Sequence, residues 1–431
     1  MIVPTNRLLL FVAALVLPAA AIGGLVPNLA LACMLLIAVA VVTFVTDAVL
    51  APARLNGVTV QPPELVRMSL HRQAAIALKI ENGPTRLKLG LAMPAEFVAK
   101  EESLEVEVRS TLAQVEWFAT PQKRGSFQLE GCYFETPSAL GFWSVRGRTA
   151  VKCEVRVYPN LAQDIRQSAA AFLNRGSAGA HAQRLIGKGR EFEKLREYEH
   201  GDTFDDIHWK TTAKRGRPIT KVFQMDRTQE VYAVIDGSRL TAREDILERY
   251  INSALMLGAV AEKQGDLFGL VTFSDRVNGF VRARNGKAHF TACREALYTL
   301  QPKLVSPDFD ELGAFLRTKL RRRALIIVLT ALDDPSLAES FLRNLSLVKR
   351  KHVVLAGMVA PAGSVPLFSG QDVETEDGIY AALGGHLAWR KIKELDRSLS
   401  HHGIRLLLLD PLRIASQVTA AYQSVKARQL L

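Results

Sequence analysis

The C-terminal half of the chain takes its fold from Val231-Tyr232-Ala233-Val234-Ile235, which runs directly into Asp236-Gly237-Ser238-Arg239-Leu240. A continuous apolar run that ends at an acidic residue is typical of a parallel strand buried on both faces. Further apolar runs follow, and segments with helical periodicity separate them. From residue 230 to residue 431 the sequence therefore predicts a doubly wound α/β domain, with helices on both faces of a parallel sheet.

Oxygen-bearing side chains follow two of these strands. Asp236 and Ser238 come directly after the first strand, and Asp333 follows the strand predicted at 324–330. Such sheets bind ligands beyond the carboxyl ends of their strands, and Mg²⁺ prefers carboxylate and hydroxyl oxygens. Asp236, Ser238 and Asp333 are therefore the candidate metal ligands, and Mg²⁺ is the candidate cofactor. The structural alternative is that Asp236 caps the following segment while Ser238 bonds to the backbone.

The pattern at these residues resembles the metal-binding signature Asp-x-Ser-x-Ser of von Willebrand factor A-type domains. Leu240 stands where the signature has its second serine, and it supplies no oxygen. No threonine is clearly placed in the middle loop, where Ser306 and Asp308 are the nearest substitutes. The resemblance implies a von Willebrand factor A-like domain whose ion site lacks one hydroxyl, which a water molecule could replace.

A dense polar segment, residues 187–215, precedes this domain, after residues 163–190, whose composition predicts a helix followed by a flexible linker. Acidic and basic residues are mixed in it, which argues against a nucleic-acid-binding stripe and favours a docking surface or a polar network. We expect a structural role for Trp209, packing the segment onto its neighbour rather than stacking on a base. The same role is expected for Arg196, Tyr198 and Asp202. The candidate partner-binding residues are Arg196, Tyr198, Gly201, Asp202, Ile207, Trp209 and Lys214.

The order of elements in this segment resembles the bacterial domain-of-unknown-function-58 (DUF 58) family. The elements that carry the resemblance are Lys123-Arg124-Gly125, Leu140-Gly141-Phe142, Val157-Tyr158-Pro159, Glu191-Phe192, Arg196-Glu197-Tyr198, Gly201-Asp202, Ile207-His208-Trp209 and Ala213-Lys214. Asp205 and Lys214 stand where the family commonly has arginine, and an ammonium group does not reproduce the two-pronged geometry of a guanidinium. The resemblance implies a protein partner, because such proteins are often encoded beside MoxR-type AAA+ ATPases and transglutaminase-like membrane proteins.

Two long apolar runs, 8–26 and 29–49, occupy most of residues 1–54. Each is long enough to cross a bilayer at about 1.5 Å per residue, and the short connection predicts a transmembrane helical hairpin. Arg7 precedes the first run and Arg54 follows the second. The positive-inside rule then places both ends, and the domains that follow, on the cytoplasmic side of the membrane. The resemblance to the bacterial family implies that this is a bacterial inner (plasma) membrane.

Two alternatives remain open at this end of the chain. Leu17 to Ala21 resembles a signal-peptide cleavage region, and cleavage there would leave one span with the bulk of the chain outside. Asp47, near the end of the second run, is either an interfacial residue or part of an ion pathway, and its position near the end favours the first. With four cysteines in 431 residues, a disulfide scaffold is excluded.

Short alternating runs separated by turn residues fill residues 55–160 and predict an antiparallel β-sandwich. Leu104-Glu105-Val106-Glu107-Val108 is the clearest of them. The sequence thus predicts a multidomain protein with a hairpin at 1–54, a sandwich at 55–160, a linker and motif segment at 161–229, and the α/β domain at 230–431.

These features favour a membrane-anchored adaptor or interaction scaffold over an enzyme. The sequence lacks Gly-x-Ser-x-Gly, His-Glu-x-x-His, a complete phosphate loop and paired-cysteine zinc spacing. One alternative is a binder of nucleic acid or anionic lipid, driven by the formal net charge of +12, although the mixed charges of residues 187–215 argue against nucleic acid. The other is a metal-dependent hydrolase or nuclease built from Asp202, Asp205, His208, Asp236 and Asp333.

Overall fold

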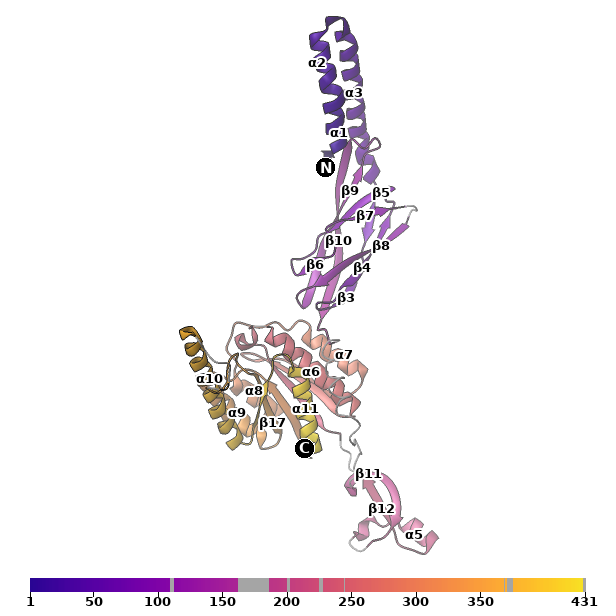
Figure 1. The fold of residues 1–431 in the computed structure, drawn as a ribbon. Coiled ribbons are helices and arrows are strands. Elements are labelled where there is room, and N and C mark those ends of the chain that lie inside the picture. The colour runs from indigo at the N-terminus through magenta and orange to yellow at the C-terminus, as the bar shows by residue number, and fades with distance from the viewer. Residues whose placement is uncertain are drawn as a thin grey trace. The chain divides into compact units, whose positions relative to one another are not determined.

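The computed structural model describes residues 1–108, 112–161, 186–199, 202–224, 228–243, 245–367, 369 and 375–428. The chain divides into two compact units, Met1–Asn160 and Leu161–Leu431. The first unit holds a pair of long helices and a β-rich domain, and the second holds a two-stranded part and an α/β domain (Figure 1).

The first unit contains the predicted pair of apolar helices. Its segments are α1 (Asn6–Phe11), a π-helical turn (Val12–Val16), α2 (Leu17–Leu25), a 3-10 turn (Pro27–Leu29) and α3 (Ala30–Leu50). The stretches Asn6–Leu25 and Pro27–Leu55 are long and apolar enough to cross a membrane, and only 6% of the most apolar part of each is buried within the protein. Apolar helices that are exposed all round are suited to lipid rather than to water.

Strand pairing and stacked rings join the base of this hairpin to the β-rich domain. Strand β1 (Ile2–Pro4), just ahead of α1, pairs antiparallel with β10 (Trp143–Tyr158). Phe142 packs edge-on against both Phe11 and Phe44, with ring centroids 5.1 and 4.9 Å away. Phe142, the last residue of the Leu140-Gly141-Phe142 element, therefore contacts both helices of the hairpin.

Asp47 is buried at the same junction. Its carboxylate accepts hydrogen bonds from the Ser138 hydroxyl at 2.6 Å and from the Leu140 backbone N–H at 3.2 Å. Close by, the Trp143 indole N–H donates to the Phe44 carbonyl at 2.9 Å. These contacts give Asp47 a structural role, because they attach the end of α3 to the β-rich domain.

The β-rich domain consists of two sheets around one core. Its strands after β1 are β2 (Thr59–Gln61), β3 (Leu65–Ser69), β4 (Ala74–Glu81), β5 (Arg86–Leu91), β6 (Phe97–Ala99), β7 (Leu104–Glu107), β8 (Leu112–Pro121), β9 (Gly125–Pro137) and β10. One sheet has the order β1-β10-β9-β5-β7, with β3 also pairing with β10, and the other has the order β2-β4-β8-β6. Alternate residues of β4 (Ile76, Leu78 and Ile80) are fully buried in the core between the sheets.

The second unit begins with what we call the motif subdomain, residues 186–224. It contains β11 (Ile186–Glu197) paired antiparallel with β12 (Ile219–Gln224), a 3-10 turn (Phe204–Asp206) and α5 (Trp209–Arg215). The helix predicted from residue 163 lies outside the described residues. The linker predicted up to residue 190 is wrong at its end, because residues 186–190 are part of β11.

The α/β domain follows, with helices on both faces of one sheet. Its elements are β13 (Glu230–Asp236), α6 (Ile246–Lys263), β14 (Leu267–Phe273), β15 (Val277–Arg284), α7 (Lys287–Leu297), α8 (Phe309–Lys319), β16 (Ala324–Leu329), α9 (Pro335–Lys349), β17 (Val353–Val359), α10 (Glu376–His401), β18 (Arg405–Leu409) and α11 (Ile414–Ala427). Side chains of α6 and α11 pack in one core, and those of α8, α9 and α10 pack in the other.

The strand order of this sheet defines where a ligand site is expected. The order is β15-β14-β13-β16-β17-β18, and every pair is parallel except that of β14 with β15. The chain moves outward from β13 in one direction and then returns to begin again at β16. Doubly wound sheets bind ligands at this reversal, beyond the carboxyl ends of the two strands that flank it. Those strands are β13, which ends at Asp236, and β16, which ends at Leu329.

Candidate functional site

Asp236 lies at this reversal point and is completely buried. One carboxylate oxygen accepts a hydrogen bond from the Ser238 backbone N–H at 2.8 Å. The other accepts from the Thr330 hydroxyl at 2.6 Å, and Thr330 directly follows β16. Burial raises the pKa of Asp236, and the hydrogen bonds from Thr330 and Ser238 offset part of that rise. The contact therefore joins the last residue of β13 to the residue that follows β16, at the place where a ligand site is expected.

The neighbouring hydroxyl groups stabilise the turn that follows β13. Ser238 is fully buried, and its hydroxyl oxygen accepts from the Leu240 backbone N–H at 3.3 Å. The Thr241 hydroxyl lies 3.0 Å from the carbonyl of Asp236 and 3.1 Å from that of Ser238. This is the structural alternative for Ser238, whose side chain bonds to the backbone.

Tyr250, on α6, links the residue that follows β16 to the last residue of β17. Its hydroxyl donates to the Thr330 carbonyl at 3.1 Å and accepts from the Val359 backbone N–H at 3.2 Å. Burial raises the pKa of Tyr250, and the nearby Asp236 and Asp333 raise it further. The ends of β16 and β17 are thereby held together beneath the loops that follow them.

Asp333 differs from Asp236 in being exposed. It lines a cavity of about 290 Å³ together with Leu332, Pro361, Leu387 and Lys391. Among the residues that the structure describes, no group of three or more His, Cys, Asp and Glu side chains is close enough to hold a metal ion. The predicted ligands therefore form two environments, one buried and hydrogen-bonded at Asp236 and Ser238, and one open at Asp333.

This donor set fits a divalent ion poorly. Asp236, Ser238 and Thr330 offer oxygens, but none of them is exposed, and both oxygens of Asp236 already accept protein hydrogen bonds. An ion at this place would have to displace those bonds and would gain no oxygen from Leu240. The hydrogen-bonding role of these side chains is sufficient to explain their burial.

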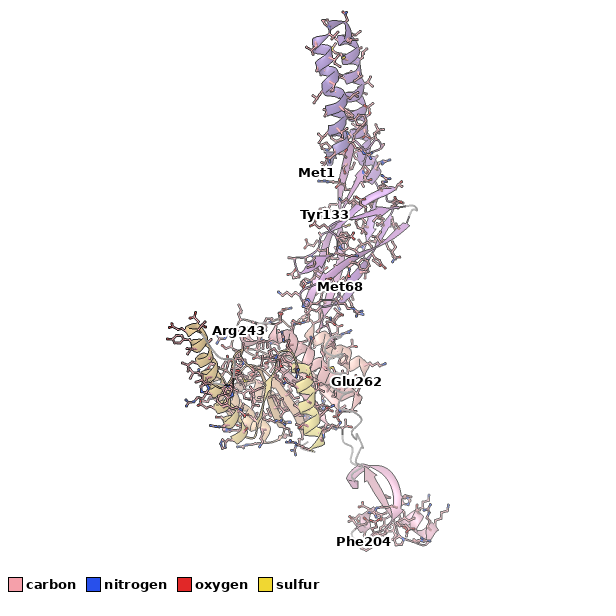
Figure 2. The ribbon with its side chains drawn as sticks, in the orientation of Figure 1. Met1, Met68, Tyr133, Phe204, Arg243 and Glu262 are labelled. Carbon is pink, nitrogen blue, oxygen red and sulfur yellow. The ribbon has the colours of Figure 1, made fainter. Side chains whose placement is uncertain are left out.

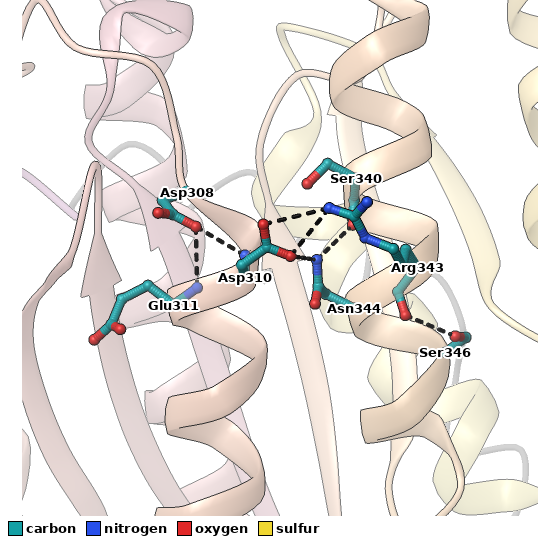
Figure 3. A network of polar contacts seen from close by, with 7 residues as sticks. All are labelled: Asp308, Asp310, Glu311, Ser340, Arg343, Asn344 and Ser346. Carbon is teal, nitrogen blue, oxygen red and sulfur yellow. Dashed lines mark hydrogen bonds and ion pairs between the residues drawn. The ribbon is translucent and has the colours of Figure 1, made fainter.

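Asp308, a suggested substitute for the missing threonine, is used in another way. Its carboxylate caps α8 by accepting from the backbone N–H groups of Asp310 and Glu311 at 2.9 and 3.0 Å. Figure 3 shows the polar network that continues from there, in which the Asp310 carboxylate meets Arg343 and Asn344 on α9. The network joins the first turn of α8 to the middle of α9. Ser306, the other suggested substitute, is exposed in the loop before α8.

In the motif subdomain, an ion pair holds the chain between β11 and α5. An Arg196 guanidinium nitrogen lies 2.6 Å from the Asp202 carboxylate, and the second Asp202 oxygen accepts from the Glu199 backbone N–H at 3.1 Å. The pKa of Asp202 is lowered, chiefly by the Glu199 hydrogen bond and further by Thr220 and Arg196. Arg196 and Asp202 thus close the loop, in agreement with the structural role expected for them.

Ile207 and His208 fix the position of α5. Ile207 is buried and bridges to Thr220 of β12, and the His208 backbone N–H donates to the Ile219 carbonyl at 2.7 Å. The His208 ring nitrogen Nδ1 accepts from the Thr211 backbone N–H and so caps α5. His208 therefore serves the helix terminus, whereas the hydrolase alternative requires it as a catalytic group.

The expectation that Trp209 packs onto a neighbour is wrong. Its side chain is 65% exposed on α5, because Ile207 and not Trp209 supplies the buried contact of this turn. Phe204, labelled in Figure 2, is 72% exposed on the preceding turn. Tyr198 is half-buried, and its ring centroid lies 6.4 Å from that of Phe204. Phe204 is the residue that sequence reasoning missed.

The remaining predicted residues lie as follows. Lys214 and Asp205 are exposed on α5 and on the turn before it. Gly201 lies outside the described residues. The structure thus joins Arg196 to Asp202, and it places Tyr198 beside Phe204 and Ile207 beside Thr220 in the same subdomain. Trp209 is exposed on α5, and Asp236 and Ser238 lie together after β13.

Comparisons with known proteins agree with part of the resemblance. The family described as "Protein of unknown function DUF58" matches residues 194–367, which include both the motif subdomain's core and the Asp236 turn. The uncharacterized proteins Rv1480 of Mycobacterium tuberculosis and Mb1516 of Mycobacterium bovis are each 24% identical over 208 residues. That alignment covers 46% of this chain and 64% of each relative.

Solved structures are similar to less than half of the chain. An aerotolerance-related membrane protein from Bacteroides fragilis and the hypothetical protein BatB from Bacteroides thetaiotaomicron each show 15% identity and a TM-score of 0.31, over 46% of this chain and 99% of theirs. The SpRpn10 VWA domain shows 10% identity and a TM-score of 0.29, over 45% of this chain and 95% of its own. The fold is therefore that of a protein with two apolar N-terminal helices followed by sheet-rich domains. The DUF58 match lies in its second unit.

Proposed function

We propose that this protein is a membrane-anchored adaptor whose α/β domain is von Willebrand factor A-like and whose motif subdomain binds a protein partner. The observation that carries the proposal is the exposure of Phe204 and Trp209 on the motif subdomain. Its loop is closed by the Arg196–Asp202 ion pair, and the start of α5 is capped by His208. Exposed aromatic side chains on a preorganised support are typical of binding hot spots.

The charge around Trp209 indicates what the partner surface offers. Lys210, Lys214 and Arg215 lie on α5 beside it, and Arg217 follows the helix; all are exposed. We therefore propose an apolar pocket with an acidic rim on the partner, which would receive Trp209 and pair with these cations. A MoxR-type AAA+ ATPase is the partner that the family resemblance implies, and a transglutaminase-like membrane protein is the second.

The anchor is the hairpin formed by Asn6–Leu25 and Pro27–Leu55. Because Arg7 and Arg54 flank it, we propose that the domains lie on the cytoplasmic side of a bacterial inner membrane. Proteolysis of the chain in right-side-out and inverted membrane vesicles tests the orientation. Cleavage between the two units only in inverted vesicles supports the cytoplasmic side, and cleavage only in right-side-out vesicles contradicts it.

A binding role is supported over catalysis by the state of two of the acids that the hydrolase alternative would use, Asp202 and Asp236. Asp202 is paired with Arg196, and Asp236 is buried and bonded to Thr330. Neither carboxylate is placed to activate water, since a general base needs access to its substrate. A purified chain that hydrolysed a phosphodiester, with the activity lost in Asp236→Asn, would contradict the adaptor function.

The decisive experiment measures binding of a purified MoxR-type ATPase from the same organism to the full chain in detergent. We expect Trp209→Ala and Phe204→Ala to weaken the complex at least about tenfold, in keeping with hot-spot aromatic residues. Tyr133→Ala is the matched control, because Tyr133 is also about half exposed (48%) but lies on β9 of the first unit.

Three other results would contradict the proposed surface. The first is unchanged binding in both motif variants. The second is an equal loss of binding in the Tyr133 control. The third is binding of the chain to anionic vesicles, but not to the ATPase, that disappears at moderate salt, which would indicate electrostatic lipid binding instead.

A further inference from the structure

Helix α10 packs on the α/β domain with only part of its length. It comprises 26 residues, and its buried residues Ile392, Leu395 and Leu399 all lie in its C-terminal half. In Figure 1 one end of the helix extends beyond the rest of the α/β domain. The N-terminal half contributes no fully buried side chain, and it meets the rest of the domain through the loop before it, where the Leu367 backbone N–H donates to His386 Nδ1 at 3.0 Å.

That half carries an apolar surface, the α10 stripe, made of Ile379, Tyr380, Leu383 and Leu387. These side chains are 56%, 72%, 45% and 51% exposed, respectively. Their spacing places them on one side of the helix, over about two turns. A continuous apolar stripe of this kind on a protein surface marks an interaction site.

The charges at the two ends of the stripe are opposite and equally spaced from its centre. Glu376 lies seven residues before Leu383, and Arg390 lies seven residues after it. Seven residues are close to two helical turns, so both charged side chains lie on the same side as Leu383. Asp377 and Lys391 extend the acidic and basic ends.

We propose that the α10 stripe binds the α10 stripe of a second copy of this chain, antiparallel, with a twofold axis at Leu383. In this arrangement Leu383 meets its own counterpart, and Ile379 meets Leu387 of the other copy. Glu376 meets Arg390 of the other copy, and the twofold axis repeats the contact. The stripe is thus complementary to itself, as the interface of a symmetric dimer has to be.

The local geometry allows such an approach. Leu383 is 45% exposed, and a side chain at the neighbouring Gly384 would meet nothing within 4 Å, so no side chain covers this part of the helix closely. Arg390 uses Nε for its ion pair with Glu394 at 3.1 Å, which leaves its two terminal nitrogens for a second carboxylate. Both members of that pair are more than half exposed, so it constrains Arg390 weakly.

A bilayer is the less suitable occupant. The acidic end of the stripe, Glu376 and Asp377, would face the anionic lipid headgroups that basic amphipathic helices bind. The proposal concerns α10 and is independent of Phe204 and Trp209, so the function proposed above and this dimer can fail separately.

Disulfide formation in liposomes that contain the full chain, driven by air oxidation with a copper–phenanthroline catalyst, tests the contact at the axis. Cys33 is first replaced by Ser, because it is only partly buried and could form a disulfide of its own. The other three cysteines are buried and can stay. Leu383→Cys is expected to form a covalent dimer at least about tenfold faster than Ala381→Cys, which is exposed on the opposite side of α10. Equal rates for the two variants, or no dimer from Leu383→Cys, would overturn the proposal.

Charge exchange tests the antiparallel register. Glu376→Arg or Arg390→Glu alone places like charges opposite each other, and each is expected to raise the dimer dissociation constant of the full chain in detergent about tenfold. The double variant restores opposite charges and is expected to return to within about threefold of the original. A double variant as weak as the single ones excludes this register. Stronger binding of Glu376→Arg to anionic vesicles, with no disulfide at position 383, assigns the stripe to lipid instead.

Discussion

Replacing Thr330 by valine removes one hydrogen bond from a buried carboxylate and leaves the shape of the side chain almost unchanged. The Thr330 hydroxyl lies 2.6 Å from Asp236, and both residues are fully buried. A hydrogen bond to a charged group contributes about 1.5–3 kcal/mol, and leaving the buried acceptor unsatisfied costs a similar amount. We therefore expect Thr330→Val to destabilise the β13–β16 pair by about 2 kcal/mol.

Hydrogen–deuterium exchange of the full chain measures this loss locally. A change of about 2 kcal/mol corresponds to about a 30-fold change in an opening equilibrium. Peptides from β13 and β16 should therefore lose about 30-fold in protection. Thr318→Val is the control, because Thr318 is exposed on α8 and its hydroxyl donates to the Ala314 carbonyl of its own helix. We expect its effect to stay within about 0.5 kcal/mol.

The effect should depend on pH with a definite sign. Because burial raises the pKa of Asp236 above its unfolded value, the folded state holds the proton more tightly. The stability that this contributes is complete below about pH 4 and is lost as the pH rises through the folded-state pKa. The Thr330 hydroxyl lowers that pKa, so removing it raises the pKa further. Thr330→Val should therefore cost more at about pH 8 than at about pH 5.

Two results would refute this reasoning. Protection in β13 that falls less than about threefold would show that Asp236 does not depend on Thr330. Protection that rises markedly when Mg²⁺ is added to the original protein would show that an ion satisfies the carboxylate instead.

Three further predictions concern other contacts. Trp209→Ala should leave the thermal midpoint within about 1 °C, because the side chain is exposed; a fall of several degrees would return Trp209 to a packing role. Arg196→Met should speed hydrogen exchange in β11 and β12, and mostly above about pH 4. Because the pKa of Asp202 is lowered in the folded state, the stability that Asp202 contributes is present above its unfolded pKa and is lost as the pH falls through its folded-state pKa. Unaltered exchange at neutral pH would contradict that role. Asp47→Ala should increase exchange at residues 138–143 by about tenfold or more, since it leaves the junction's donors unpaired, and no change there would show that the aromatic contacts suffice.

The sequence predicted the strands of the α/β domain well because each is a continuous apolar run. Val231–Ile235 is the centre of β13, and the predicted strand at 324–330 includes β16. It did not predict the partner of Asp236. Thr330 is 94 residues away, and its contact depends on strand order, which hydrophobic periodicity does not encode.

The motif segment was harder to predict, for two physical reasons. Charged residues and glycines dominate residues 186–191, so the alternation that indicates a strand is weak in β11. Helix α5 has only seven residues, too few for its sequence to show which side is covered. Ile207 fills the buried position, and Trp209 is left on the surface.

The junction between hairpin and sandwich has a mechanical consequence. Phe142 lies between rings of both helices, and Asp47 ties α3 to Ser138. If the helix pair spans a bilayer as proposed, a change in its tilt to match a thicker or thinner bilayer would rotate the β-rich domain with it. The orientation of the β-rich domain relative to the membrane would then depend on lipid composition.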